Sequence, residues 1–456
     1  MNKVLFLGSV MAPAIAFTQQ KPNIVFIMTD DLGWSDCGCY GNPFNETPNI
    51  DALAKTGIRF TNAYASAPVS SPSRAAMLTG KYPARLQFTN FMHGNRKDAL
   101  SPVLPAQFNS YLSPKEITIA ELLRDNDYAT GHVGKWHIGF HDTCAPWSQG
   151  FTYSRIGGGD YYCNSYYEDG WQVGHKDTNK YYLTDKQTEQ GIDFIRMNKG
   201  KPFFLYLAYQ APHIPIVPRG DKVPKYLAKY EKYHGKYNPY YAALVESIDD
   251  GVGEIVKALK AEGLFENTLI IFTSDNGGVG LPEGGPSPTS CEPLRKWKGH
   301  IYEGGIRVPA IIVWQGTIKQ GQTCEAPFSN VDFLPTFCEL AGIKKLPADV
   351  DGKSISQLLK NPSDPKYNRG PIYWHYPHFS NQEGRPAGGM RLGDFKLVEN
   401  YETNKLELYN LKDDISESND LSAKMPDKTK EMYDMFVKWR KSVNAQMPLP
   451  NPDYKK

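Results

Sequence analysis

Short, fully apolar runs alternate with longer amphipathic segments along most of this chain. The apolar runs are rich in β-branched and aromatic residues, which is typical of strands buried on both faces of a sheet. We predict such strands, each followed by polar or glycine-rich sequence, at residues 23–28, 203–209, 268–273 and 308–314. Their pattern favours parallel pairing, because parallel sheets are covered on both faces.

The amphipathic segments between these runs predict helices. Residues 117–126 carry apolar side chains at helical spacing, and Thr118 stands where an N-cap is expected. Residues 240–262 form a longer amphipathic segment, and Gly263 follows it as a left-handed stop. Strands that alternate with helices over this length predict a doubly wound α/β sheet flanked by helices.

The pattern changes after Lys344. Proline and aspartate accumulate through residues 346–371, as in a surface connection. Beyond it, residues 390–398 and 406–410 predict antiparallel strands, and residues 429–443 predict a closing helix. We therefore expect a catalytic domain at residues 21–365 and a smaller C-terminal α+β subdomain at residues 366–456.

The N-terminus has the pattern of an export signal. Lys3 precedes an apolar stretch over residues 4–17, and Ala14 and Ala16 form a small-x-small cleavage site. Pro13 interrupts the stretch, which is too short to span a bilayer. We predict a signal peptide at residues 1–18, no membrane span, and a periplasmic or secreted protein.

Composition narrows the choice of ligand. The 456 residues carry a formal net charge of +2, and acids and bases are interspersed, which argues against a nucleic-acid partner. An anionic ligand would have to bind through local cations. The 28 Tyr and 8 Trp could stack on sugar rings, although filling of the core accounts for most of them.

Acidic pairs follow two of the predicted strands. Asp30 and Asp31 come directly after the first strand, and Asp275 and Asn276 follow the strand at 268–273. Because ligands gather at the carboxyl ends of strands in open α/β sheets, we expect these pairs to converge. Their hard oxygen donors suit Ca²⁺ or Mg²⁺ better than zinc. Either pair alone would be read as turn or capping chemistry.

The segment Ser70-Ser71-Pro72-Ser73-Arg74, with Ala75 to Gly80 after it, resembles the signature of the type I sulfatases of the alkaline phosphatase-like superfamily. In that family the first residue is oxidised to formylglycine. Ser70 matches the serine-type bacterial carbohydrate sulfatases, so the resemblance implies a serine-type formylglycine-generating maturation enzyme as a partner. It also implies an alkaline phosphatase-like doubly wound mixed sheet.

The resemblance extends to Gly134-Lys135-Trp136-His137, Pro212-His213 and Lys298-Gly299-His300, which occur in the family's order. It implies that Asp30, Asp31, Asp275 and Asn276 hold calcium together with the formylglycine at position 70. Further roles follow from it: Arg74 and Lys135 steady the nucleophile, while Lys135, His213 and Lys298 bind the sulfate. It also makes His137 the base that regenerates the aldehyde; His213 is our candidate general acid.

The residues that would select the substrate are less clearly indicated by the sequence. His375, His378 and Arg385 lie in the connection to the small subdomain and could contact a sugar, or simply pack the loop. Residues 90–96, with His93 and Arg96, are a second candidate. A glycan carrying sulfated galactose or N-acetylgalactosamine is the substrate that the resemblance favours.

Two alternatives stay open at this stage. The same kind of sheet hosts phosphomonoester, phosphodiester and phosphonate ester hydrolases, although no second cluster of zinc ligands is evident in the sequence. The chain could also be a sulfated-glycan-binding protein in which Ser70 is never modified. Comparing release of sulfate with release of phosphate separates the first alternative, and a Ser70→Ala variant separates the second.

Overall fold

Residues 21–139, 141–156, 182–282 and 286–455 are described by the computed structural model. The predicted signal peptide at residues 1–18 lies outside these residues. None of the helices described is long and apolar enough to cross a lipid bilayer.

A large mixed sheet forms the centre of the molecule, and nine strands belong to it in the part of the chain described. Its order is β10-β2-β8-β7-β1-β6-β4-β5, with β9 also paired to β2. The strands are β1 (Asn23–Thr29), β2 (Ile58–Tyr64), β4 (Ala129–Gly134), β5 (Tyr153–Ile156), β6 (Phe203–Ala208), β7 (Thr268–Ser274), β8 (Arg307–Trp314), β9 (Gln322–Cys324) and β10 (Phe328–Ser329).

Strand direction follows the prediction in the middle of this sheet but not throughout. β1 pairs in parallel with both β6 and β7, as expected. The fourth predicted strand, β8, is antiparallel to β7 and to β2, so its assignment as a parallel strand was wrong. All eight of its residues are buried, and a strand with helices over both faces has the same apolar pattern in either direction.

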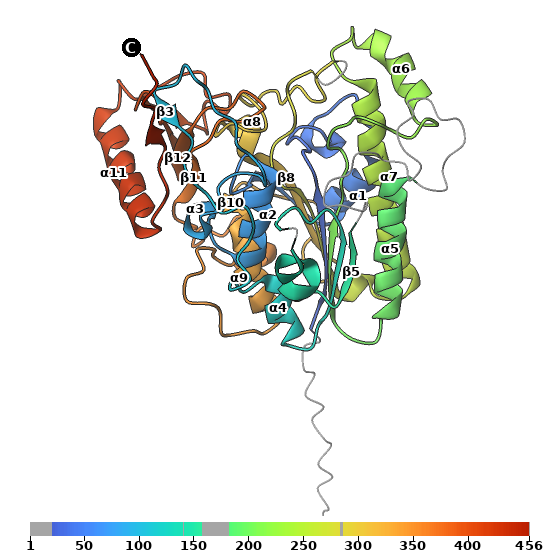
Figure 1. Cartoon of the computed structure of the whole chain (residues 1–456). Helices are drawn as coiled ribbons and strands as arrows, with labels where there is room; N and C mark the ends of the chain where they lie inside the picture. The colour runs from blue at the N-terminus through green and yellow to red at the C-terminus, as the bar shows by residue number, and fades with distance from the viewer. Residues whose placement is uncertain (1–20, 140, 157–181, 283–285, 456) are drawn as a thin grey trace, which may run out of the picture.

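Helices cover both faces of the sheet (Figure 1). The alternation of side chains along β1 sends Phe26 and Met28 into one core and Val25 and Ile27 into the other. The first core is closed by α2 (Ser70–Thr79), α4 (Ile119–Arg124) and α9 (Phe333–Leu340); the second is closed by α1 (Pro48–Thr56), α5 (Leu183–Met197) and α7 (Pro239–Ala261).

The two predicted helices form with the expected ends. Thr118 and Glu121 make a reciprocal capping box at the start of α4. α7 ends at Ala261, and Gly263 has a φ of 69°, the left-handed conformation that glycine adopts readily. Shorter helices lie in the connections, at α3 (Pro83–Leu86), α6 (Val223–Lys232), α8 (Glu303–Ile306) and α10 (Ser356–Lys360). Single 3₁₀ turns lie at η1 (Gly38–Tyr40), η2 (Asp142–Cys144), η3 (Pro146–Gln149), η4 (Phe265–Asn267) and η5 (Asn330–Asp332).

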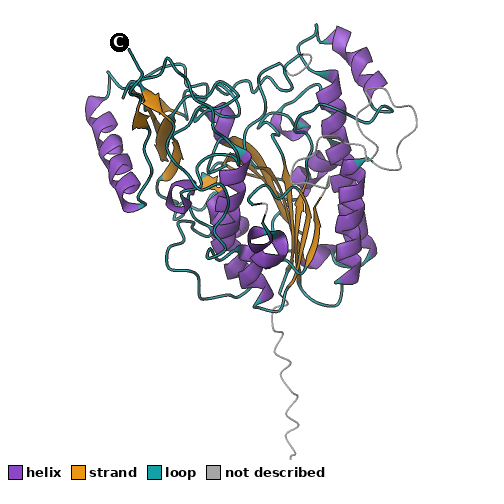
Figure 2. Ribbon diagram, in the orientation of Figure 1, coloured by secondary structure: helices purple, strands orange, loops and turns teal. Residues whose placement is uncertain are grey.

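The C-terminal part forms a separate small sheet beside the large one, as Figure 2 shows. Its four antiparallel strands are β11 (Ile372–Tyr376), β12 (Ala387–Leu392), β13 (Phe395–Asn400) and β14 (Leu406–Asn410), and α11 (Pro426–Ser442) packs on them. The run at 390–398 is thus a hairpin rather than one strand, since Gly393 turns the chain at a φ of 60°. The boundary after residue 365 stays a prediction.

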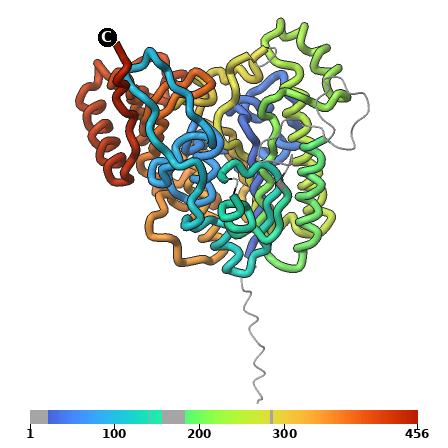
Figure 3. The backbone as a smooth tube through the Cα atoms, in the orientation of Figure 1, coloured from blue at the N-terminus to red at the C-terminus, as the bar shows by residue number. Residues whose placement is uncertain are grey.

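A segment from the N-terminal half of the chain reaches this small subdomain. β3 (Val103–Leu104) pairs antiparallel with β15 (Leu449–Pro450) near the end of the chain. Figure 3 shows the two segments side by side. This pairing joins the loop that leads into β3 to the last residues of the small subdomain.

Candidate active site

The acidic pairs meet at the carboxyl ends of neighbouring parallel strands. Asp30 and Asp31 follow β1, while Asp275 and Asn276 follow β7. The Asp31 backbone has a φ of 66°, and its N–H donates to Asp275 Oδ1 at 3.2 Å. The Asn276 amide donates to Asp31 Oδ1 at 2.7 Å. All four side chains are buried, so the predicted convergence of the two pairs is present.

Ser70 is the first residue of α2 and faces this acidic group. Its Oγ donates to Asp30 Oδ1 at 3.1 Å and lies 3.3 Å from Asn276 Oδ1. One turn later, Arg74 Nε donates to Asp275 Oδ2 at 2.8 Å, and Nη2 lies at ion-pair distance, 2.8 Å, from the same oxygen. Every residue of α2 is buried, so the helix fixes Ser70 and Arg74 relative to the strand ends.

Two lysines and a histidine complete the cluster. Lys135, directly after β4, donates to Asp30 Oδ2. Lys298 reaches Asp31 Oδ2 at 2.6 Å, and His213 Nε2 lies 3.5 Å from the same oxygen. These residues come from loops more than 70 positions apart in the sequence, and the strand ends bring them together.

Mutual charge stabilisation governs the protonation of this cluster. Burial opposes ionisation of Asp30, but Lys135 and then His213 outweigh it and hold the pKa of Asp30 below its usual value. Burial also opposes the Asp31 carboxylate, and there Lys298 keeps its pKa low. The pKa of Lys298 is raised, because Asp31 and Asp30 more than offset its burial. The carboxylates and Lys298 are therefore all charged near neutral pH.

The arrangement fits a bound divalent cation. Donor atoms of Asp30, Asp31 and His213 lie within 4.8 Å of one another. Asp275 Oδ1 and Asn276 Oδ1 lie against the same group, through the Asp31 N–H and the Ser70 Oγ respectively. Carboxylate and amide oxygens are the donors that Ca²⁺ and Mg²⁺ prefer.

A cavity of about 280 Å³ opens onto the cluster. Ser70, His137, His213 and Lys298 line it. His137 has a φ of 59° and a half-buried ring, and its Nδ1 has no hydrogen-bond partner among the described residues. Burial, then the charges of Lys135 and Arg74, hold the pKa of His137 well below its usual value. A neutral imidazole that faces the cavity can accept a proton.

The three predicted sugar contacts lie elsewhere. His375 is buried, and its ring nitrogens lie 2.7 Å from Tyr401 Oη and 2.9 Å from the Gln446 carbonyl oxygen. His378 is buried against Thr89 at 2.8 Å. Arg385 forms ion pairs with two acids and lines a second cavity. None of the three lines the cavity at Ser70.

Sequence reasoning missed other residues that do line it. Asn381 and Gln382 come from the loop between β11 and β12 of the small subdomain. Phe91, Met92 and His93, from the loop after α3, also line the cavity; they lie within residues 90–96, which we had considered as a second candidate for contact with the sugar. Tyr206 on β6 was also missed; its hydroxyl accepts a hydrogen bond from Arg74 at 3.2 Å. A polar side chain in a loop or a buried tyrosine gives no sequence signal of its own.

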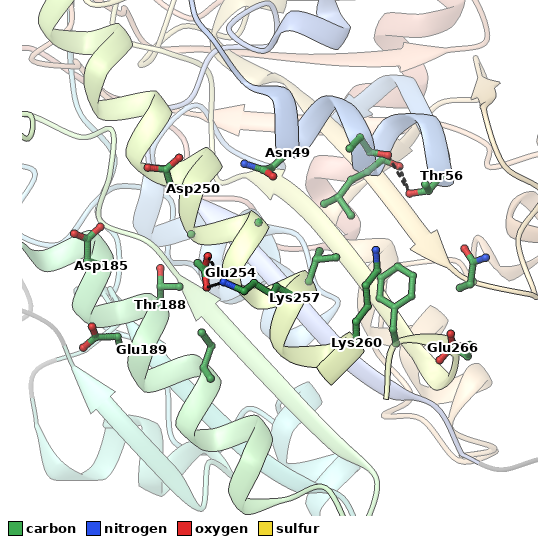
Figure 4. A pocket seen from close by; sticks show the side chains of 18 of the residues that line it. Asn49, Thr56, Asp185, Thr188, Glu189, Asp250, Glu254, Lys257, Lys260 and Glu266 are labelled. Carbon is green, nitrogen blue, oxygen red and sulfur yellow. Dashed lines mark hydrogen bonds and ion pairs between the residues drawn. The ribbon is translucent and has the colours of Figure 1, made fainter. Parts of the chain in front are cut away.

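A larger cavity in the described part of the chain shares no lining residue with the one at Ser70. It holds about 1190 Å³ between α1, α5 and α7, and Figure 4 shows the acidic and basic side chains along it. Several of them pair with one another, as Lys257 does with Glu254 at 3.2 Å. No residue of the buried cluster lines it. Size alone therefore does not mark the candidate active site.

Fold and site together define a class of protein: an α/β protein whose buried serine and hard oxygen donors meet at the strand ends of a mixed sheet. Residues 22–343 match the sulfatase family, and residues 296–442 match the C-terminal region of N-sulphoglucosamine sulphohydrolase. The chain belongs to the sulfatase family. It is accordingly a sulfuric ester hydrolase.

Individual relatives cover most of the chain. A sulfatase of Formosa agariphila is 31% identical over 97% of this chain and 93% of its own length. The N-acetylgalactosamine-6-sulfatase of Mus musculus is 34% identical over 78% of this chain and 69% of its own. The protein in the crystal structure of Ps i-CgsB in complex with k-i-k-neocarrahexaose is 32% identical in sequence to this chain. The two structures match with a TM-score of 0.78 over 92% of this chain and 93% of that one.

Proposed function

We propose that this protein removes sulfate from a carbohydrate sulfate ester, with a formylglycine made from Ser70 as the nucleophile and Ca²⁺ at Asp30, Asp31, Asp275 and Asn276. The observation that carries the proposal is the position of Ser70. Its Oγ lies 3.1 Å from Asp30 and 3.3 Å from Asn276, at the floor of the cavity that His137, His213 and Lys298 line. A serine-type maturation enzyme would supply the modification.

The charges of the cluster suit an anionic ester. The carboxylates of Asp30, Asp31 and Asp275 are balanced by Arg74, Lys135 and Lys298, so a divalent cation leaves the site positive. When bound, calcium would neutralise charge on the sulfate oxygens, and formylglycine would supply the oxygen nucleophile. Within the chain itself, Lys135 and Lys298 then stabilise charge on the non-bridging oxygens.

Two histidines handle protons in this proposal. His213 lies on the Asp31 side of the cavity and, in the protonated form that Asp30 and Asp31 favour, donates to the departing sugar oxygen. The neutral His137 accepts a proton from the group at position 70. Arg74, held on Asp275, keeps the first turn of α2 in place. This division of labour lets one buried site both break the ester and release sulfate.

The proposed substrate is a glycan that carries sulfated galactose or N-acetylgalactosamine. Support comes from the relatives, since one is named an N-acetylgalactosamine-6-sulfatase and one was crystallised with a neocarrahexaose. The predicted signal peptide at residues 1–18 further suggests a periplasmic or secreted enzyme that meets such glycans outside the cytoplasm.

The test compares sulfate and phosphate release from the same sugar, with wild type, Ser70→Ala and Ser110→Ala. Ser110 is exposed and does not line the cavity at Ser70, so it serves as the matched control. We expect Ser70→Ala to lose sulfate release while it still binds the sulfated glycan. Equal or faster phosphate release by wild type would overturn the sulfatase assignment, and undiminished sulfate release by Ser70→Ala would overturn the role of position 70.

A further inference from the structure

A second cavity, also of about 280 Å³, is lined by residues that neighbour those of the cavity at Ser70 along the chain. The same two segments of chain line both. Residues 91–93 line the inner cavity, and residues 96–99 continue into the outer one. Likewise, Asn381 and Gln382 line the inner cavity, whereas Ser380 and Glu383 line the outer one. His93 and Arg96 are three residues apart, so their Cα atoms are separated by at most about 11 Å.

Hydrogen bonds fix the shared wall. The Ser380 N–H donates to the Gly384 carbonyl oxygen at 2.8 Å, and the Gln382 N–H donates to Ser380 Oγ at 3.0 Å. Trp297 Nε1 donates to the Gln382 carbonyl oxygen at 3.0 Å, one residue before Lys298. The outer cavity is therefore tied to the loop that carries a lysine of the active site.

Arg385 braces the outer cavity and has little charge left for a ligand. It pairs with Asp98 at 2.5 Å and with Glu402 at 2.6 Å, and it lies over the Phe379 ring. These contacts join the loop of residues 96–99 to the small sheet. The charge of Arg385 is thus paired within the protein.

Arg96 and Lys97 are different. Both are exposed and line the outer cavity, and neither makes an ion pair or hydrogen bond within the part of the chain described. Three bases and two acids line this cavity, and one base and one acid are the Arg385–Asp98 pair. The remaining charge is positive, and Arg96 lies three residues along the chain from His93, which lines the cavity at Ser70.

We propose that the outer cavity is a subsite for a second anionic group of the substrate, a carboxylate or a sulfate on the sugar next to the one that is desulfated. The proposal rests on the proposed function of the Ser70 site. The substrate is then a polyanionic oligosaccharide that spans both cavities, with Arg96 and Lys97 as the residues that select it.

The test uses the double variant Arg96→Gln/Lys97→Gln and a matched control, Lys344→Gln/Lys345→Gln. The control removes two adjacent exposed lysines in the loop after α9, outside both cavities. Four substrates carry the same sulfated galactosamine unit. One is this monosaccharide alone, and the other three are disaccharides in which the second sugar is neutral, a uronate or a sulfated sugar. The measured quantity is kcat/KM for sulfate release.

We expect the double variant to lose about 5- to 10-fold in kcat/KM on the anionic disaccharides and to keep wild-type values on the other two substrates. A larger loss with the uronate or with the sulfated neighbour identifies which anion the subsite takes. An equal loss on all four substrates, or none on any, overturns the subsite.

Failure of the proposed function itself would look different, because wild type would then release no sulfate from any substrate. In that case, the subsite is still tested by calorimetry, which measures the affinity for the disaccharide whose second sugar is sulfated. Ser70→Ala should bind it more tightly than Ser70→Ala/Arg96→Gln/Lys97→Gln, and equal affinities overturn the inference.

Discussion

At the scale of single residues, the direction of the pKa shift favours the neutral form of the two histidines and the charged form of Asp30, Asp31 and Lys298. Burial lowers the pKa of His137, and the neighbouring Lys135 and Arg74 charges lower it further. The pKa of His213 is lowered chiefly by burial, although Asp30 opposes the shift. Both imidazoles therefore favour the neutral form, and His137, whose Nδ1 has no hydrogen-bond partner among the described residues, is placed to accept a proton.

Replacing His137 with alanine should lower kcat for sulfate release by about 10²- to 10⁴-fold, because a positioned base is lost. KM should change little, since the sulfate is held by other groups in our proposal. Steady-state kinetics measure both constants. His141→Ala, at an exposed histidine four residues away, is the control. A variant that keeps more than about a tenth of wild-type kcat would contradict the role of His137.

At the scale of elements, one helix is held by a buried carboxylate from another. Asp249 on α7 accepts the backbone N–H groups of Asn49 and Ile50 at 3.1 and 2.8 Å, at the start of α1. Asp249 has no exposed surface, and burial raises its pKa to about 6 against these hydrogen bonds. Its ionisation therefore connects the stability of α1 to pH.

The sign follows from that raised pKa. Between pH 4 and 6 the folded protein keeps a proton on Asp249 that the unfolded chain has released, so the free energy of unfolding falls as pH rises. The fall attributable to this group is at most about 3 kcal/mol. Asp249→Asn should be less stable overall, because its amide offers one acceptor instead of two, but its stability should depend less on pH in this window. Urea unfolding at several pH values measures this, and identical slopes for the two proteins would contradict it.

Some helices and strands could be predicted from the sequence, and others could not. Caps and periodicity located α4 and α7 because Thr118 and Gly263 act within one turn of the chain. Strand direction in β8 was missed, because burial of both faces leaves no alternation to read. β4 was missed as well, since Gly131 and Gly134 weaken its strand pattern.

The residues of the candidate site likewise include some that the sequence predicts and some that it does not. Asp30, Asp275 and Ser70 were predictable because strand ends and a family signature place them. His375 was not, because its partners Tyr401 and Gln446 are distant in the sequence and only the folded subdomain buries its ring. Contacts that depend on two loops meeting, such as Asn381 in the cavity, leave no local signal.

At the scale of the whole molecule, a buried ion cluster joins the small subdomain to the active-site loop. Lys396 on β13 lies 2.9 Å from Glu303 and 2.8 Å from Glu417, with all three side chains buried. Glu303 begins α8, five residues after Lys298. The subdomain thus holds the loop that carries Lys298.

Lys396→Met should therefore cost about 3–5 kcal/mol of unfolding free energy, because it leaves two buried carboxylates without their shared cation. Lys405→Met is the control, since Lys405 lies at the edge of the same sheet and pairs with Glu407 while largely exposed. Denaturant unfolding measures both. A loss below about 1 kcal/mol in Lys396→Met would show that the cluster does not anchor the subdomain.

The account as a whole depends on the chemistry of position 70. Peptide mass spectrometry across Ser70, in protein isolated from its own host, tests it most directly. The account predicts a peptide lighter by the hydrogen lost when an alcohol becomes an aldehyde, together with its hydrate, and capture by a carbonyl reagent. An unmodified Ser70 in protein that releases sulfate at full rate would contradict it.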